Sequence, residues 1–207
     1  APQALATDPD NRLLWSYPVR RLESEAVRDS LLAVAGALDG RLMGPPTGFL
    51  TTPDGQVVGQ TDQPGQTSFG SRRSLYLRQR RSEPVTFLQT FDLAAPEPNC
   101  LRRSSSTVVG QALALLNNPF AVHMADRFAA RVAAESVHNL DARILRAYQI
   151  ALGRPADEEE TAQLREFLTT QQVRYRQAGL TDDESLAAAL VDLCQALLAS
   201  NEFLYIP

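Results

Sequence analysis

Lysine is absent from this 207-residue sequence, so all 20 of its basic residues are arginine. The bias is most simply a result of GC-rich coding, although arginine is also the better bidentate partner for carboxylate, phosphate or sulfate. The 24 acidic residues bring the net charge to -4, which argues against general binding to nucleic acids.

Cysteine and histidine are also scarce, with two residues of each. Neither cysteine has a histidine or a second cysteine at metal-ligand spacing, which disfavours a metal site and a cysteine nucleophile. No stretch approaches the roughly 20 apolar residues of a membrane-spanning helix. With 44% hydrophobic and 21% charged residues, the composition is ordinary for a globular protein.

The feature around which we expect the fold to be built is residues 102–120, RRSSSTVVGQALALLNNPF. Two arginines and four hydroxyl residues lead into a run that is apolar on every side, and Asn117-Asn118-Pro119 ends it. A helix without a polar face must be enclosed by other elements. The pattern therefore predicts a central apolar helix with a polar entrance.

Amphipathic patterns predict the remaining helices. Apolar residues recur at helical spacing through residues 24–38, and four more such segments follow Pro119. Asp157 and Glu160 have the spacing of a capping box, and Asp182 or Asp183 opens the last helix. Residues 74–79 alternate polar and apolar, as is typical of a short strand. The predicted fold class is mainly α, an irregular helical bundle around the central helix with one short strand or hairpin.

Residues 40–71 are rich in glycine and proline and almost without periodicity. We expect a long loop excursion there, either poorly ordered or covering a site. The helical core is expected over residues 104–206, within a single helical domain over residues 1–207. The first residues lack the basic and apolar regions of a signal peptide, so we expect a fragment of a larger protein.

Several long motifs, in this order, resemble one family. They are DPDNRLLW (8–15), RRLESEAVRDSLLAVAG (20–36), RRSLYL (72–77), FDLAAPEPNCLRRSSSTVVGQALALLNNPF (91–120), ALGRPADEEE (151–160) and LCQALLASNEFLYI (193–206). Through these motifs the chain resembles the planctomycete-type secreted domain of unknown function that follows cytochrome c modules. The resemblance implies an extracytoplasmic protein whose upstream domains, among them a cytochrome c module, are partners of this part. It also implies a link to the use of complex, often sulfated, polysaccharides.

The chain departs from the resemblance in lacking a Cys-x-x-Cys-His motif. It therefore cannot attach a c-type haem by that motif, and we predict no cofactor for it. In an exported protein two cysteines more often pair than stay free, so we predict a disulfide between Cys100 and Cys194. The alternative is two separate buried thiols.

Two arginine pairs flank the predicted strand and the predicted central helix. If these elements meet, the arginines form a cationic patch beside serine hydroxyls and helix N-terminal amides, which suits a sulfate or carboxylate. The candidate anion-binding residues are Arg72, Arg73, Arg102, Arg103, Ser104 and Ser105. The alternative is structural, with one arginine of each pair bridging to Asp92, to Glu83 or to backbone carbonyls and locking the loops.

The function that these patterns favour is a non-catalytic accessory or scaffold domain with a surface for acidic or sulfated glycan. The alternative is part of a polysaccharide-acting enzyme whose site is shared with an upstream region. A hydrolase needs two carboxylates across a cleft, roughly 5 to 9.5 Å apart, and Asp92, Glu97 and Glu202 are the acids to examine. The sequence identifies no catalytic residue.

Overall fold

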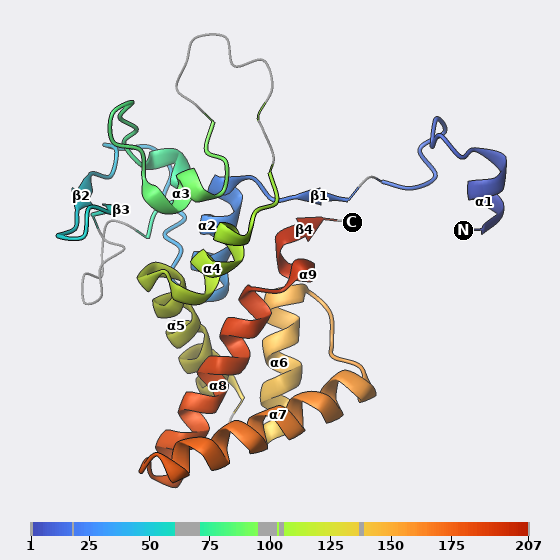
Figure 1. The fold of residues 1–207 in the computed structure, drawn as a ribbon, viewed down its shortest axis with the longest axis vertical. Helices are drawn as coiled ribbons and strands as arrows, with labels where there is room; N and C mark the ends of the chain where they lie inside the picture. The colour runs from blue at the N-terminus through green and yellow to red at the C-terminus, as the bar shows by residue number, and fades with distance from the viewer. Residues whose placement is uncertain are drawn as a thin grey trace.

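The computed structural model describes residues 2–17, 19–60, 71–94, 103, 106–136 and 139–206. In these ranges the chain forms α-helices and two small antiparallel sheets of two strands each. The predicted mainly α fold class is confirmed (Figure 1). None of the helices in the described ranges combines the length and apolar character needed to span a bilayer.

The second half of the chain is a set of helices joined by short links. They are α5 (Pro119–Glu135), α6 (Leu140–Leu152), α7 (Glu158–Gln177), α8 (Asp182–Leu198) and α9 (Asn201–Leu204). The local signals that begin and end them are those expected from the sequence. Asn118 caps α5 ahead of Pro119, Gly153 ends α6 in the left-handed conformation, and Asp157 with Glu160 forms the predicted capping box of α7. Thr181 is the cap residue of α8.

The first half has shorter elements. They are α1 (Pro2–Thr7), β1 (Arg20–Arg21), α2 (Ser24–Val34), β2 (Phe49–Thr51), β3 (Val57–Gly59), the 3-10 turn η1 (Ser74–Tyr76), α3 (Thr86–Thr90) and α4 (Val109–Asn117). The short strand β4 (Tyr205–Ile206) pairs antiparallel with β1, in the register Arg20 with Ile206 and Arg21 with Tyr205. This sheet places the C-terminal end of the helical half beside the start of α2.

The core is centred on α5 and α8. In Figure 1, α8 lies between α5 and α6, with α7 crossing beneath, and α8 contacts α5, α6 and α7. Phe128 and Val132 of α5 are fully buried, as are Leu193 and Cys194 of α8. The inward-facing stripes of these two helices therefore contribute a large share of the apolar core.

The helix expected at the centre is α4, and the structure corrects its position. Of its residues only Gln111 and Leu115 are buried, whereas the exposed fractions of Val109, Leu113 and Leu116 are 77%, 51% and 48%. The helix is short and rests with one side on α3, α5 and α8. An apolar composition shows that a helix can be enclosed, but not that enough neighbours surround it.

Two further expectations for the first half need correction. Residues 40–71 are not wholly irregular, because β2 and β3 pair as an antiparallel hairpin around Gly55, which has a φ of 83°. The turn signal Pro53-Asp54-Gly55 between two apolar runs could have revealed this hairpin. Residues 74–79 form the turn η1 and one isolated bridge from Leu77 to Thr47 rather than a strand. Residues 61–70 lie outside the described ranges.

Candidate functional site

A polar cleft lies where β1, β4, the start of α2 and the approach to α4 meet. Its volume is about 620 Å³, within the range that is typical of ligand pockets. We call it the entrance cleft. Its polar lining residues are Arg20, Arg21, Glu23, Asp92, Arg103, Thr107 and Tyr205.

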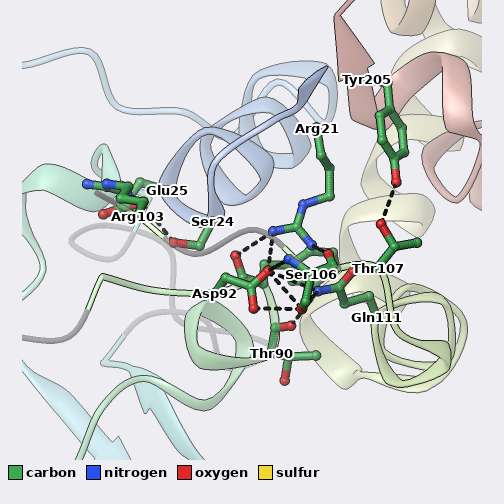
Figure 2. A network of polar contacts seen from close by, with 11 residues as sticks. Arg21, Ser24, Glu25, Thr90, Asp92, Arg103, Ser106, Thr107, Gln111 and Tyr205 are labelled. Carbon is green, nitrogen blue, oxygen red and sulfur yellow. Dashed lines mark hydrogen bonds and ion pairs between the residues drawn. The ribbon is translucent and has the colours of Figure 1, made fainter. Parts of the chain in front are cut away.

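A buried ion pair between Arg21 and Asp92, drawn in Figure 2, lies in the lining of the entrance cleft. The Arg21 side chain, 5% exposed, donates from Nη2 to Asp92 Oδ2 at 2.7 Å and to the Phe91 carbonyl at 3.0 Å. Its Nη1 donates to the Ser106 carbonyl at 2.8 Å. Arg21 Nε is buried and has no acceptor among the described residues, so this guanidinium is incompletely satisfied.

Asp92 is held by groups from two other parts of the chain. Its carboxylate accepts from the Ser106 backbone N–H at 2.7 Å and from Ser106 Oγ, besides Arg21. Burial by itself raises the pKa of Asp92, but the hydrogen bonds from Ser106 and Arg21 outweigh it, and the net pKa is lowered. Asp92 is therefore a permanent anion at neutral pH and an anchor, not a proton donor.

Gln111 connects this ion pair to α4. Its Nε2 donates to the Thr90 carbonyl at 3.1 Å and lies 3.3 Å from Ser106 Oγ. Thr107 Oγ1 lies 3.2 Å from the Tyr205 hydroxyl, which links the approach to α4 with β4 (Figure 2). The entrance cleft is thus a hydrogen-bonded junction between elements that are far apart in sequence.

Arg20 has a different environment from Arg21. Its guanidinium lies 5.2 Å from the centre of the Tyr17 ring, a cation–π distance. Among the residues that the structure describes, no carboxylate pairs with it. Arg20 is exposed at the rim of the entrance cleft, so it can bind an incoming anion without first losing a partner.

Comparison with known proteins identifies the family. Residues 1–168 match the family described as PSD1, protein of unknown function (DUF1553). The chain belongs to the DUF1553 family. No curated protein and no solved structure matches it.

The matched part of this DUF1553 chain contains β1, α2, Asp92 and α4, and so most of the lining of the entrance cleft. The remaining lining residues, Tyr205 and Ile206, come from β4, beyond the match. The family description assigns no activity, so a proposal for function depends on the geometry of the site.

The structure places Arg73 and Arg103 against successive turns of α2. Arg103 Nη1 lies 2.7 Å from Glu25 Oε2, and Arg73 Nε lies 3.7 Å from Asp29 Oδ2. Residues 25 and 29 share one face of the helix. Burial by itself raises the pKa of Glu25, but hydrogen bonds from Arg103 and Ser24 lower it overall. The two predicted arginines therefore come near one another, but each faces a carboxylate.

Arg72 serves the loop that precedes β2. It is buried, and its guanidinium donates to the carbonyls of Pro45, at 2.9 Å, and Met43, and stacks 3.8 Å above the Tyr76 ring. This is the loop-locking alternative that the sequence left open. Arg72 borders a separate cavity of about 330 Å³ under that loop and is not part of the entrance cleft.

Four of the predicted site residues lie outside the described ranges: Cys100, Arg102, Ser104 and Ser105. Cys194 is buried in α8, and burial raises the pKa of its thiol. The Cys100–Cys194 disulfide stays a prediction. In the ranges that are described, no three His, Cys, Asp or Glu side chains gather as a metal site.

Sequence reasoning missed Arg20, Arg21 and Tyr205 as site residues. The doublet Arg20-Arg21 was available as a third arginine pair, directly before a helix rich in acids. Tyr205 has no local signal, because its role depends on the pairing of β4 with β1.

Proposed function

We propose that this DUF1553 chain is a non-catalytic accessory domain that binds an acidic or sulfated glycan at the entrance cleft. The observation that carries the proposal is Arg20, an exposed guanidinium at the cleft rim with no carboxylate partner in the described chain. A guanidinium matches sulfate and carboxylate groups through two parallel hydrogen bonds.

Two tyrosines at or near the entrance cleft support a sugar as the carrier of that anion. Tyr17 lies beside the guanidinium, and Tyr205 lines the cleft from β4. An exposed tyrosine offers a flat apolar ring, against which the C–H face of a sugar can pack, and a polar hydroxyl. An arginine beside an exposed tyrosine therefore suits a sugar ring that bears an anionic substituent.

Of the three acids considered from the sequence, Asp92 and Glu202 argue for binding rather than hydrolysis, and Glu97 lies outside the described ranges. Asp92 is neutralised by Arg21, and Glu202 shares Arg154 with Glu160. Hydrogen bonds from Arg154 lower the pKa of Glu202 and, with a further bond from the Asp157 N–H, lower that of Glu160 to about 2. A glycosidase acid needs a raised pKa, so none of these acids has the required environment.

The biological setting in this proposal comes from the sequence resemblance. We place the domain in an exported planctomycete-type protein with upstream domains, including a cytochrome c module, that acts on complex polysaccharide. In that setting the cleft would retain the protein on its substrate while another part performs the chemistry.

Thermal unfolding with a panel of neutral, carboxylated and sulfated polysaccharides tests the proposal. A ligand at 100 times its Kd stabilises a protein by about 2.7 kcal/mol. For a chain of this size that is a rise in Tm of roughly 5 to 11 °C. We expect the rise with acidic or sulfated glycans and its loss in Arg20→Ala.

Arg81→Ala is the matched control, because it removes the same charge from an exposed position outside the cleft. It should leave the response unchanged. No response to any glycan would overturn the proposal, and so would an equal loss in both variants, which would indicate general charge attraction.

A further inference from the structure

A second cavity, of about 330 Å³, lies under the loop of residues 41–48, and we call it the loop cavity. It shares no lining residue with the entrance cleft. Its volume is at the small end of the range that is typical of ligand pockets. The polar side chains of Arg72 and Gln60 line it together with apolar residues of the loop. These apolar residues are Leu42, Met43, Pro45 and Pro46.

Arg72 brings a positive charge to the loop cavity that no described carboxylate pairs with. The residue is 6% exposed, and its guanidinium donates to the carbonyls of Pro45 at 2.9 Å, Arg41 at 3.3 Å and Met43. Carbonyl oxygens accept hydrogen bonds but carry no net charge. Asp39 acts on Arg72 only at longer range, because Arg41 binds its carboxylate from Nε at 2.8 Å and Nη2 at 2.6 Å. Buried charges are normally paired, since their removal from water is costly.

The hydrogen bonding of Arg72 is incomplete as well. A guanidinium has five N–H groups, and the Nε of Arg72 is buried with no acceptor among the described residues. Arg21 Nε also lacks an acceptor, but Asp92 neutralises that guanidinium. Arg72 therefore lacks both an acceptor and a counter-charge in the described chain, and one bound anion can supply both.

The loop that walls the cavity is fixed around Arg72. Met43 has a φ of 64°, a left-handed conformation that is unfavourable for methionine. Its N–H donates to the Tyr76 hydroxyl at 2.8 Å, and its carbonyl accepts from Arg72. Strained residues of this kind persist only where their surroundings fix them, and they concentrate at ligand sites and other functional positions. These bonds hold the wall of the loop cavity in place.

We propose that the loop cavity binds a small organic carboxylate, whose negative charge neutralises Arg72. A carboxylate matches the donors of a guanidinium, and the apolar walls suit a hydrocarbon body rather than a fully hydrated ion such as sulfate. The side-chain amide of Gln60, which has no hydrogen-bond partner among the described residues, offers a further donor. This site is independent of glycan binding at the entrance cleft.

Calorimetric titration with benzoate, an apolar ring that bears one carboxylate, tests the proposal. With benzoate up to about 10 mM we expect saturable binding at one site, and binding about tenfold weaker or less for benzamide, which has the same shape without the charge. Hydrogen exchange should slow in residues 41–48 when benzoate is added. That protection distinguishes the loop cavity from the entrance cleft.

Leu42→Glu is the decisive variant, because it leaves Arg72 and its carbonyl partners unchanged and adds a competing carboxylate to the cavity wall. We expect it to lose benzoate binding. Leu75→Glu adds the same charge in place of an exposed leucine outside the cavity and should bind benzoate as the unsubstituted chain does. Arg20→Ala, at the entrance cleft, should also bind it normally. Circular dichroism checks that each variant is folded.

Four results would overturn the proposal. Equal binding of benzamide would show that the apolar walls act without the charge of Arg72. Equal binding of sulfate would show that the site does not select an organic acid. Undiminished binding to Leu42→Glu would place benzoate elsewhere, and no binding of benzoate to the unsubstituted chain would mean that Arg72 takes no carboxylate ligand.

Discussion

Removal of the Asp92 carboxylate should be among the most damaging single changes to this fold. In Asp92→Ala, the Arg21 guanidinium stays buried without its counter-charge, and the Ser106 N–H loses its acceptor. Breaking a buried ion pair from one side costs about 3 to 5 kcal/mol, and an orphaned buried donor about 1 to 3 kcal/mol.

These contributions belong to one network and do not add fully. Arg21 also keeps the Phe91 and Ser106 carbonyls as acceptors, which reduces the cost. Asp92 has a φ of 62°, a left-handed conformation that aspartate tolerates better than alanine does. We therefore expect a total loss of roughly 3 to 5 kcal/mol, which lowers Tm by roughly 6 to 20 °C.

Urea unfolding followed by circular dichroism measures this loss. Asp92→Asn keeps the shape and one acceptor oxygen, so it should lose about half as much, since only the charge and one hydrogen bond are affected. Asp126→Ala, an exposed acid on α5, is the control and should change stability by less than about 0.5 kcal/mol. If Asp92→Ala lost less than about 1 kcal/mol, the ion pair would not be the anchor of the cleft.

The pH dependence of stability provides a second measure of the same network. Because the pKa of Asp92 is lowered in the folded state, the carboxylate contributes stability above its ordinary value of 3.8. That contribution is lost as the pH falls through the folded-state pKa. The loss of stability below about pH 4 should therefore be smaller in Asp92→Asn than in the unsubstituted chain.

Two other changes test the remaining arginine contacts. Arg72→Ala should remove the hydrogen bonds to the carbonyls of Pro45 and Met43, so hydrogen exchange and proteolysis of that loop should accelerate. Arg72→Lys should not restore protection against exchange, because an ammonium group lacks the planar set of donors of a guanidinium. An unchanged rate of hydrogen exchange would mean that the conformation of this loop does not depend on Arg72. Arg154 lowers the pKa of Glu160 from 4.5 to about 2, so the contribution of the Glu160 carboxylate to stability is lost as the pH falls through that interval. Glu160→Gln should therefore show a smaller fall in stability between pH 4.5 and 2. An unaltered acid transition would show that the pair with Arg154 contributes nothing measurable.

The sequence by itself determined the helices of the second half, because their signals are local. A capping residue, a left-handed glycine or a proline acts within one helical turn, and Asp157, Gly153 and Pro119 each lie where the structure uses them. The mainly α class follows from the same local signals. The turn signal at Gly55 also predicts the hairpin, but the many glycines and prolines around it favoured an irregular loop instead.

Only the tertiary structure decided which surfaces are covered and which arginines are paired. Arg72, Arg73 and Arg103 look equivalent in sequence, yet one binds loop carbonyls and two face acids of α2, while Arg20 has no carboxylate partner in the described chain. The entrance cleft requires β1 and β4, which lie some 185 residues apart, to pair. Contacts at that separation depend on how whole helices pack. The free energy of burial is summed over all neighbours of a residue, so no short sequence motif indicates it. The same reason explains why the apolar run of α4 predicted a helix correctly and its enclosure wrongly.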